Sequence, residues 1–247
     1  MCVKILLVGA SGIGLAFAKR LVSRGHEVVV CGRRAEQLAM AKSEVPSLLT
    51  IQGDVSTEEG RVALAAKVIA DFPQVNVLIN NAGIQNRLPP FTDPSHKDAL
   101  WPRHKEEMAI NFEAPIHLGF LLLPHLLTKG AAQIVNVTSG LAFVPISFMP
   151  VYCATKAAMH SFTMSLRQQL LSTPCSVLEV IPPAVNTDLG GAGLHTMGEN
   201  LDEFADAVFA RMEAGELEIG YKMSEAGRMA SREQLDQNFK YLNNPHK

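Results

Sequence analysis

Cysteine is scarce in this chain and follows no paired pattern. Four cysteines occur among 247 residues, and none form a CxxC pair. Scattered thiols of this kind are typical of reduced core residues in a cytosolic protein, rather than of disulfides or metal ligands. The eight histidines also lack the spacing of a zinc site, and no HExxH motif accompanies His117 and His125. We therefore expect a cytoplasmic protein without a bound metal.

Long apolar runs and a predominant sign of charge are absent too. The apolar run Leu118–Leu127 is interrupted by Pro124 and His125, whereas a membrane-spanning helix needs about 20 apolar residues. The 22 lysines and arginines nearly balance the 24 aspartates and glutamates, and the two signs are interleaved. This pattern predicts neither a membrane span nor a nucleic-acid partner.

What the chain does contain is a repeated alternation of short apolar runs and longer segments with helical periodicity. The apolar runs are nearly continuous, as is typical of parallel strands buried on both faces. They predict strands at Ile5–Val8, Val28–Cys31, Leu48–Ile51, Val75–Ile79, Ile134–Val137 and Val177–Ile181. Helices are predicted at Ile13–Ser23, Ala35–Glu44, Thr57–Asp71, Arg103–Leu127 and Tyr152–Leu171. The alternation predicts an α/β fold over residues 1–247: a single-domain, Rossmann-like, doubly wound parallel sheet in three layers.

Two segments interrupt this rhythm. Ile84–Pro102 holds four prolines, and Pro182–Asn200 holds two prolines and four glycines, so both are predicted to be loops. Long loops in compact domains are often binding loops, although each could also be a plain surface insertion. Near the end, Glu218–Tyr221 is predicted to be a short last strand, and Ser231–Leu242 a helix with Ser231 as its N-cap.

The run VYCATKAAM places Lys156 four residues after Tyr152. On a helix, residues four apart share a face, one turn from each other. A neighbouring cation favours the phenolate and lowers the tyrosine pKa from about 10 towards the range in which proton transfer is efficient. Spacing alone also fits an ordinary helix with a tyrosine and an exposed lysine.

A glycine-rich segment, Gly9-Ala10-Ser11-Gly12-Ile13-Gly14, lies between the first predicted strand and the first helix. Glycines there let the backbone approach a pyrophosphate, which the helix N-terminus attracts. At the end of the second strand, where an acidic residue would select NAD(H), the chain has Arg33 and Arg34. Guanidinium groups can grip a phosphate, so NADP(H) is favoured over NAD(H). Alternatively, the two arginines merely begin a solvated helix.

Together these motifs resemble those of the short-chain dehydrogenase/reductase family from Lys4 to about Leu189. The resemblance rests on the glycine-rich loop, Asp54-Val55, Asn80-Asn81-Ala82-Gly83, Asn111, Ser139, Tyr152-x-x-x-Lys156 and Pro182-x-x-x-x-Thr187. Within the family, the segments Ile134–Pro145 and Pro182–Asp188 are most similar to the DltE-like oxidoreductase branch.

The resemblance implies catalytic roles for Tyr152, Lys156, Ser139 and Asn111. Tyr152 would be the general acid that protonates a carbonyl oxygen as a hydride arrives, or the base in the reverse reaction. Lys156 would lower the Tyr152 pKa and bond the nicotinamide ribose, and Ser139 would hold the substrate oxygen. Asn111 would hold a water that links Lys156 to solvent; taken alone, it could also be a helix-kink residue.

The resemblance also implies the residues that bind the cofactor. Asp54 would bind the adenine amino group, Val55 would line its pocket, and Thr187 would fix the carboxamide. The full set of implied cofactor contacts is Gly9, Ser11, Gly12, Ile13, Gly14, Arg33, Arg34, Asp54, Val55, Asn81, Ala82, Gly83, Tyr152, Lys156, Pro182, Val185 and Thr187.

The chain departs from the family pattern in its glycine-rich loop, which is one residue shorter than G-x-x-x-G-x-G, and at Pro183, which replaces a glycine. The predicted function is an NADP(H)-dependent carbonyl reductase or secondary-alcohol dehydrogenase. The shortened loop leaves open a dinucleotide-binding regulatory or scaffold protein with weak or no catalysis, or loss of cofactor binding.

Two further expectations concern the binding partners. The loops predict an apolar pocket for a neutral, hydrophobic carbonyl compound or alcohol, formed by Leu88, Phe91, Trp101, Phe143, Met149, Leu189, Leu194 and Met197. The family resemblance implies a homodimer or homotetramer that pairs through the helices Arg103–Leu127 and Tyr152–Leu171.

Overall fold

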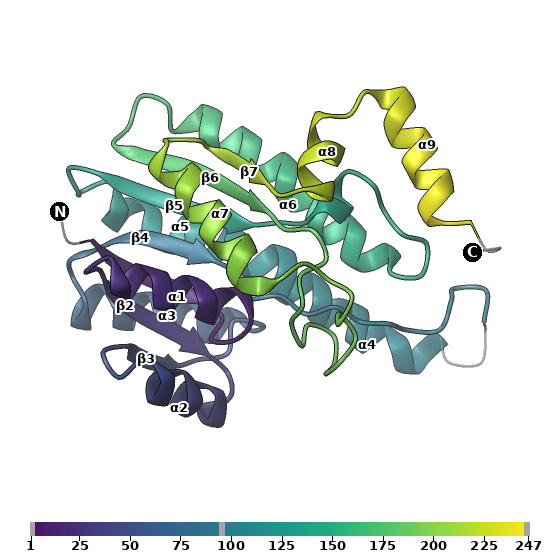
Figure 1. The fold of residues 1–247 in the computed structure, drawn as a ribbon. Helices are drawn as coiled ribbons and strands as arrows, with labels where there is room; N and C mark the ends of the chain where they lie inside the picture. Colours follow the sequence, from purple (N-terminus) through teal and green to yellow (C-terminus); the bar gives the residue numbers. More distant parts are fainter. Residues whose placement is uncertain (1–2, 94–96, 245–247) are drawn as a thin grey trace.

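A parallel sheet forms the middle layer of the protein (Figure 1). The computed structural model describes residues 3–93 and 97–244. In this part of the chain the strand order is β3-β2-β1-β4-β5-β6-β7, and every neighbouring pair is parallel. The strands are β1 (Lys4–Val8), β2 (Glu27–Gly32), β3 (Leu49–Gln52), β4 (Val75–Asn80), β5 (Ala132–Val137), β6 (Cys175–Ile181) and β7 (Glu218–Gly220). The order reverses between β1 and β4, which opens a crevice at the carboxyl ends of these strands.

Helices cover both faces of the sheet. On one face, α1 (Ile13–Ser23), α2 (Ala35–Glu44) and α7 (Leu201–Glu213) contribute to one buried apolar cluster. On the other face, α3 (Glu58–Asp71) and α5 (Ala114–Leu126) contribute to a second cluster with the end of α6 (Pro150–Gln169). The fold class predicted from the sequence is therefore confirmed: a Rossmann-like, three-layer α/β/α structure.

The remaining helices gather near the carboxyl ends of the strands (Figure 1). They are α4 (Lys97–Met108), the π-helical turn Ala109–Glu113, the 3₁₀ turn Gly140–Ala142, α8 (Met223–Met229) and α9 (Arg232–Leu242). Ser231 caps α9 as expected: its hydroxyl accepts from the N–H of Gln234, whose side chain accepts from the N–H of Ser231.

The structure corrects three expectations about the elements. The loop predicted over Ile84–Pro102 ends in helix, because α4 begins at Lys97 and carries Pro102 inside it. The helix predicted over Arg103–Leu127 is not continuous α-helix but contains the π-helical turn. Helix α7 was not predicted, although Asn200 caps it by accepting from the N–H groups of Asp202 and Glu203.

Aromatic packing attaches α7 to α1. The Phe17 ring on α1 lies 6.3 Å from that of Phe204 and 5.3 Å from that of Phe209, and Phe17 is 1% exposed. Phe204 also meets the ring of Tyr221, just after β7. These contacts hold the chain that follows Pro182–Asn200 against the sheet.

Two further features concern the residues that the structure describes. Among them, no helix is both long and apolar enough to cross a bilayer. The same part of the chain holds no group of three or more His, Cys, Asp or Glu side chains arranged to bind a metal ion.

Replacing Phe17 by alanine is expected to destabilise the protein by about 3–5 kcal/mol, because truncating a buried phenylalanine leaves a cavity. The melting temperature should fall by roughly 10 °C in differential scanning calorimetry. Met40→Ala is the control, since Met40 on α2 is 55% exposed. Equal melting temperatures for Phe17→Ala and the parent would contradict the role of this cluster.

Candidate active site

Helix α6 presents Tyr152 and Lys156 on one face, towards the carboxyl end of β5. Pro150 occupies the first turn of α6, where a proline has no intrahelical N–H bond to lose. Both side chains are 5% exposed, and Lys156 Nζ lies 5.7 Å from the centre of the Tyr152 ring. Lys156 Nζ donates a 2.9 Å hydrogen bond to the carbonyl oxygen of Val137. The four-residue spacing does bring the two side chains together.

Ser139 lies two residues beyond the end of β5 and is 7% exposed. Its side chain caps the 3₁₀ turn Gly140–Ala142 by accepting from the N–H of Leu141 at 3.1 Å. The Ser139 hydroxyl lies near enough to the Tyr152 phenol to lower its pKa. The capping bond fixes the serine oxygen beside the phenol, where both could face one substrate oxygen.

Asn111 lies in the π-helical turn between α4 and α5 and is 2% exposed. Its amide binds the backbone of Ile84 twice, accepting from the N–H and donating to the C=O, each at 2.8 Å. A Cβ atom added to Gly83 would lie 3.3 Å from Asn111 Oδ1 and 3.7 Å from Lys156 Nζ. Asn111 thus lies within the π-helical turn and, across Gly83, near Lys156. Turns of this kind often occur at functional sites.

The glycine-rich loop closes tightly despite its missing residue. Gly9 and Gly12 have φ angles of +112° and +52°, which favour glycine. A Cβ atom on Gly14 would lie 2.1 Å from the carbonyl oxygen of Gly9 and 2.5 Å from Nδ2 of Asn81. Within the loop, the N–H of Gly14 donates to the carbonyl oxygen of Ser11 at 3.1 Å. No side chain would fit at Gly14, which follows Ile13, the first residue of α1.

The other predicted cofactor residues line the same edge of the sheet. The segment after β4 approaches the glycine-rich loop, since a Cβ atom added to Gly9 would lie 3.0 Å from the backbone nitrogen of Ala82. The segment after β6 approaches it too, since a Cβ atom added to Gly12 would lie 3.3 Å from the Thr187 side chain. The carbonyl oxygen of Pro182 accepts from the N–H of Gly140 at 2.8 Å, and Val185 is 4% exposed in a bridge with Glu199. Loops after β1, β4, β5 and β6 therefore converge at the crevice.

Comparison with known proteins identifies the family of this fold and site. The family model described as short chain dehydrogenase matches residues 3–197. The chain belongs to the short-chain dehydrogenase family. The uncharacterized oxidoreductase DltE of Bacillus subtilis (strain 168) is 41% identical over 242 residues, which cover 95% of this chain and 94% of that protein. The predicted placement near the DltE-like oxidoreductases is confirmed.

More distant members share the architecture of this short-chain dehydrogenase. The NADP-dependent 3-hydroxy acid dehydrogenase YdfG of Salmonella typhi is 32% identical over 73% of this chain and 72% of its own length. The structure of a short-chain dehydrogenase from Sphingobium yanoikuyae in complex with NADPH has a TM-score of 0.80 at 24% identity, over 99% of this chain and 98% of that one. An enzyme from Burkholderia phymatum in complex with NAD also has a TM-score of 0.80, at 20% identity over 99% and 96%.

The two arginines after β2 differ in their surroundings in this short-chain dehydrogenase. Arg33 lies 2.8 Å from a carboxylate oxygen of Glu106 on α4 and 4.0 Å from one of Asp54. Arg34 is exposed at the N-cap of α2, and its guanidinium forms no hydrogen bond or ion pair with any other described residue. The Asp54 carboxylate accepts from the N–H of Ser56 at 2.9 Å, and Val55 beside it is 8% exposed. The structure thus places the unpaired guanidinium of Arg34 and the hydrogen-bonded carboxylate of Asp54 near the end of β2.

The pKa of Tyr152 is not lowered in this structure, in contrast to the net effect expected from its spacing to Lys156. Burial raises the pKa of Tyr152 above its usual value, and the nearby Ser139 hydroxyl offsets only part of this effect. Burial also lowers the pKa of Lys156 to about 8, against the opposing influence of the Glu179 carboxylate. Loss of water therefore sets the direction of both pKa shifts, and the phenol is held protonated.

A cavity of about 510 Å³ lies between the loop after β4, α4 and the start of α6. Its lining reaches Val151, the residue before Tyr152, and includes neither Tyr152 nor Ser139. Of the residues expected to form an apolar pocket, Leu88, Phe91 and Met149 line this cavity. Trp101, Phe143, Leu189, Leu194 and Met197 do not line it, and Met197 is 98% exposed. The expected pocket is therefore only partly right, because the Pro182–Asn200 segment contributes none of this lining.

Sequence reasoning missed two polar residues of this cavity, His104 and Glu107. Glu107 is 1% exposed, accepts from the N–H of Asn86 at 2.8 Å, and has a pKa raised by burial. His104 is 8% exposed, and its ring stacks on that of Phe91 with centres 5.4 Å apart. Their three-residue spacing on α4 was the available signal, but it lay at the edge of a segment predicted to be a loop.

Proposed function

We propose that this protein is an NADP(H)-dependent oxidoreductase that interconverts a carbonyl compound and a secondary alcohol within a single dinucleotide-binding domain. The observation that carries the proposal is the cluster of Ser139, Tyr152 and Lys156 at the crevice between β1 and β4. The glycine-rich loop and the end of β2 would hold the cofactor, which supplies the hydride when bound. The chain itself would bind and orient the substrate and move the proton.

Tyr152 acts as the general acid in this proposal. The phenol is protonated through the neutral range, as donation to a carbonyl oxygen requires, while burial makes it a weaker acid. The Ser139 hydroxyl would bond the same oxygen and stabilise the negative charge that develops on it. The Lys156 ammonium would favour the phenolate left after proton transfer. In the reverse reaction Tyr152 is the base.

Replacing Tyr152 by phenylalanine is expected to lower kcat by at least about 100-fold, the usual contribution of a general acid. The assay follows NADPH absorbance with a panel of neutral ketones, aldehydes and keto acids. Tyr221→Phe also removes one hydroxyl and is expected to keep the parent kcat. Equal turnover by Tyr152→Phe and the parent would refute the mechanism, and tight NADPH binding without turnover on any substrate would favour the regulatory alternative.

The substrate in this proposal is neutral and largely apolar. The cavity between α4 and the start of α6 is lined mostly by apolar side chains, among them Leu88, Phe91 and Met149. The buried Glu107 carboxylate also lines it and would repel an anionic substrate. We therefore expect the keto acids of the panel to be poorer substrates than neutral ketones of similar size.

The NADP(H) preference is assigned to Arg34. Its guanidinium is exposed and unpaired among the described residues, whereas that of Arg33 is engaged by Glu106. Arginine can bond a 2′-phosphate through two parallel N–H groups. The name of the Salmonella typhi relative, an NADP-dependent enzyme at 32% identity, supports this preference.

Arg34→Ala is expected to weaken NADPH binding by about tenfold or more, because a hydrogen bond to a charged group contributes about 1.5–3 kcal/mol. NADH binding should be unchanged, since NADH lacks the 2′-phosphate. Calorimetric titration with both nucleotides gives the two dissociation constants. Arg33→Ala is the matched control and should have the smaller effect. Undiminished NADPH affinity in Arg34→Ala would rule out this assignment.

We also propose that two copies of the chain pair through α5 and α6 and that the protein is cytoplasmic. Phe120 on α5 is 70% exposed and Met164 on α6 is 50% exposed, and a second copy would cover such apolar side chains. Cys31, Cys153 and Cys175 are buried free thiols, which supports a reducing compartment.

Light scattering is expected to give a mass of at least twice 26.8 kDa. Phe120→Glu should shift the protein towards monomer, because pairing would bury an unpaired carboxylate. Met40→Glu, on the opposite face of the sheet, should leave the mass unchanged. A monomeric parent at micromolar concentration would contradict the pairing.

A further inference from the structure

Three successive turns of α6 are connected to three successive residues at the end of β5. Tyr152, Lys156 and His160 follow one another at four-residue spacing and therefore share one face of the helix. Tyr152 lies near the Ser139 hydroxyl, which lowers its pKa, and Lys156 donates to the carbonyl oxygen of Val137. His160, the third residue of the row, reaches β5 indirectly through a carboxylate.

That carboxylate is Glu179, in the middle of the otherwise apolar strand β6. Its side chain is fully buried, with an exposed fraction of 0%. Glu179 Oε1 accepts from the Thr138 hydroxyl at 2.6 Å, and Oε2 lies 2.9 Å from His160 Nδ1. Because an ionised carboxylate only accepts, Nδ1 carries the proton of this second bond. Thr138 lies between Val137 and Ser139. These three consecutive residues are therefore each linked to one of the three α6 residues, Thr138 to His160 through Glu179.

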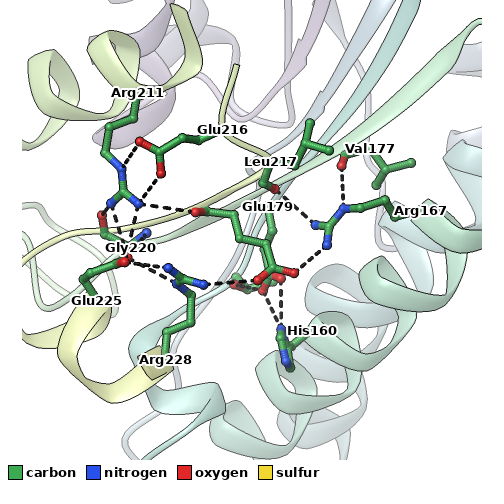
Figure 2. Close-up of polar contacts among 12 residues, drawn as sticks. His160, Arg167, Val177, Glu179, Arg211, Glu216, Leu217, Gly220, Glu225 and Arg228 are labelled. Carbon is green, nitrogen blue, oxygen red and sulfur yellow. Dashed lines mark hydrogen bonds and ion pairs between the residues drawn. The ribbon is translucent and has the colours of Figure 1, made fainter. Parts of the chain in front are cut away.

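A buried carboxylate is costly unless nearby groups compensate for its lost hydration. The groups that compensate Glu179 are the Thr138 hydroxyl, His160 and the charge of Lys156. Figure 2 shows His160 reaching Glu179, with the ion pairs of Arg167, Arg211 and Arg228 close by. Arg167 and Arg228 both bind the Glu218 carboxylate on β7, at 2.5 and 3.3 Å, so their charges are already paired.

We propose that Glu179 and His160 form a positioning pair behind the catalytic centre: their bonds fix the end of β5 against α6, and the Glu179 carboxylate, held by His160 one helical turn from Lys156, stabilises the lysine ammonium. The inference rests on the proposed function but concerns residues to which that function assigns no role. The Glu179 side chain is 0% exposed, so it would not touch a substrate.

The charges around Lys156 explain why such a pair is useful. Burial alone drives Lys156 towards its neutral form, while Glu179 raises the pKa of the lysine. The pKa of His160 is itself raised, chiefly by its hydrogen bond with Glu179. Once pH exceeds the pKa of His160, the imidazole is neutral and no longer cancels the carboxylate charge. The field of Glu179 on Lys156 then strengthens as the solution becomes more alkaline.

The titratable and charged groups around the pair come from four elements. Glu179 itself lies on β6. The others are Tyr152, Lys156, His160 and Arg167 on α6, Glu218 on β7, and Arg228 on α8. Of these, Lys156 is the one whose charge the proposed proton transfer uses.

The test is the titration of Lys156 followed by NMR of protein labelled with ¹³C at lysine Cε, a readout that needs no turnover. The Lys156 signal is the one missing from Lys156→Met. In Glu179→Gln, which retains an acceptor for Thr138, Lys156 should titrate about one pH unit lower than in the parent, within the range for loss of a neighbouring opposite charge. The alkaline limb of kcat/KM for carbonyl reduction should move by the same amount.

Two controls separate charge from packing. Glu218→Gln removes a carboxylate already bound by Arg167 and Arg228, and should leave the Lys156 titration in place. His160→Gln keeps a donor for Glu179 and should also leave the alkaline limb in place. If Glu179→Gln does not fold, the double variant His160→Leu/Glu179→Leu replaces the pair with apolar side chains, which buried ion pairs often tolerate, and carries the same expectation.

An unchanged Lys156 titration in a folded variant without the Glu179 carboxylate would overturn the inference, even if the melting temperature fell. A parent enzyme without turnover would refute the proposed function, yet the NMR titration would still decide whether Glu179 stabilises the Lys156 ammonium.

Discussion

The packing of α6 against the carboxyl end of β5 fixes the geometry on which the candidate active site depends. Ser139 lies near Tyr152 and the carbonyl oxygen of Val137 accepts from Lys156, so the two elements meet at the crevice. Parallel strands place their carboxyl ends at one edge, so the glycine-rich loop and the ends of β4 and β6 reach the same place. A shift of α6 along β5 would therefore separate the catalytic groups from the cofactor site.

Burial is the second constraint, and it acts on both members of the tyrosine–lysine pair. Each side chain is 5% exposed, and removal from water disfavours the phenolate and the ammonium alike. The short spacing between two groups does not by itself set their charge states. What sets them is the balance between lost hydration and every nearby charge, including Glu179 from the neighbouring strand.

The glycine-rich loop is one residue shorter than the family pattern, but it still packs tightly. Gly9 and Gly14 both lie close to the Asn81 side chain.

Local sequence patterns predicted much of this molecule. Near-continuous apolar runs indicated the parallel strands, because a strand covered on both faces must be apolar on both. The pattern failed at α4, where Pro102 suggested a loop, and at α7, which follows a segment rich in glycine. Both helices are stabilised by contacts with distant residues, as Phe17 on α1 shows for α7. Packing of this kind outweighs local preference, and a single segment does not reveal it.

By itself, then, the sequence determined the fold class and the residues of the candidate active site, since strand periodicity, glycine turns and helical spacing are local properties. Only the tertiary structure decided how those residues behave. Glu106, far along the chain, pairs with Arg33 and leaves Arg34 free. Glu179 reads as an oddity in an apolar strand until β6 packs beside α6 and brings it to His160. Charge states and pairings depend on which distant segments exclude water from each other, and that is a property of the folded chain.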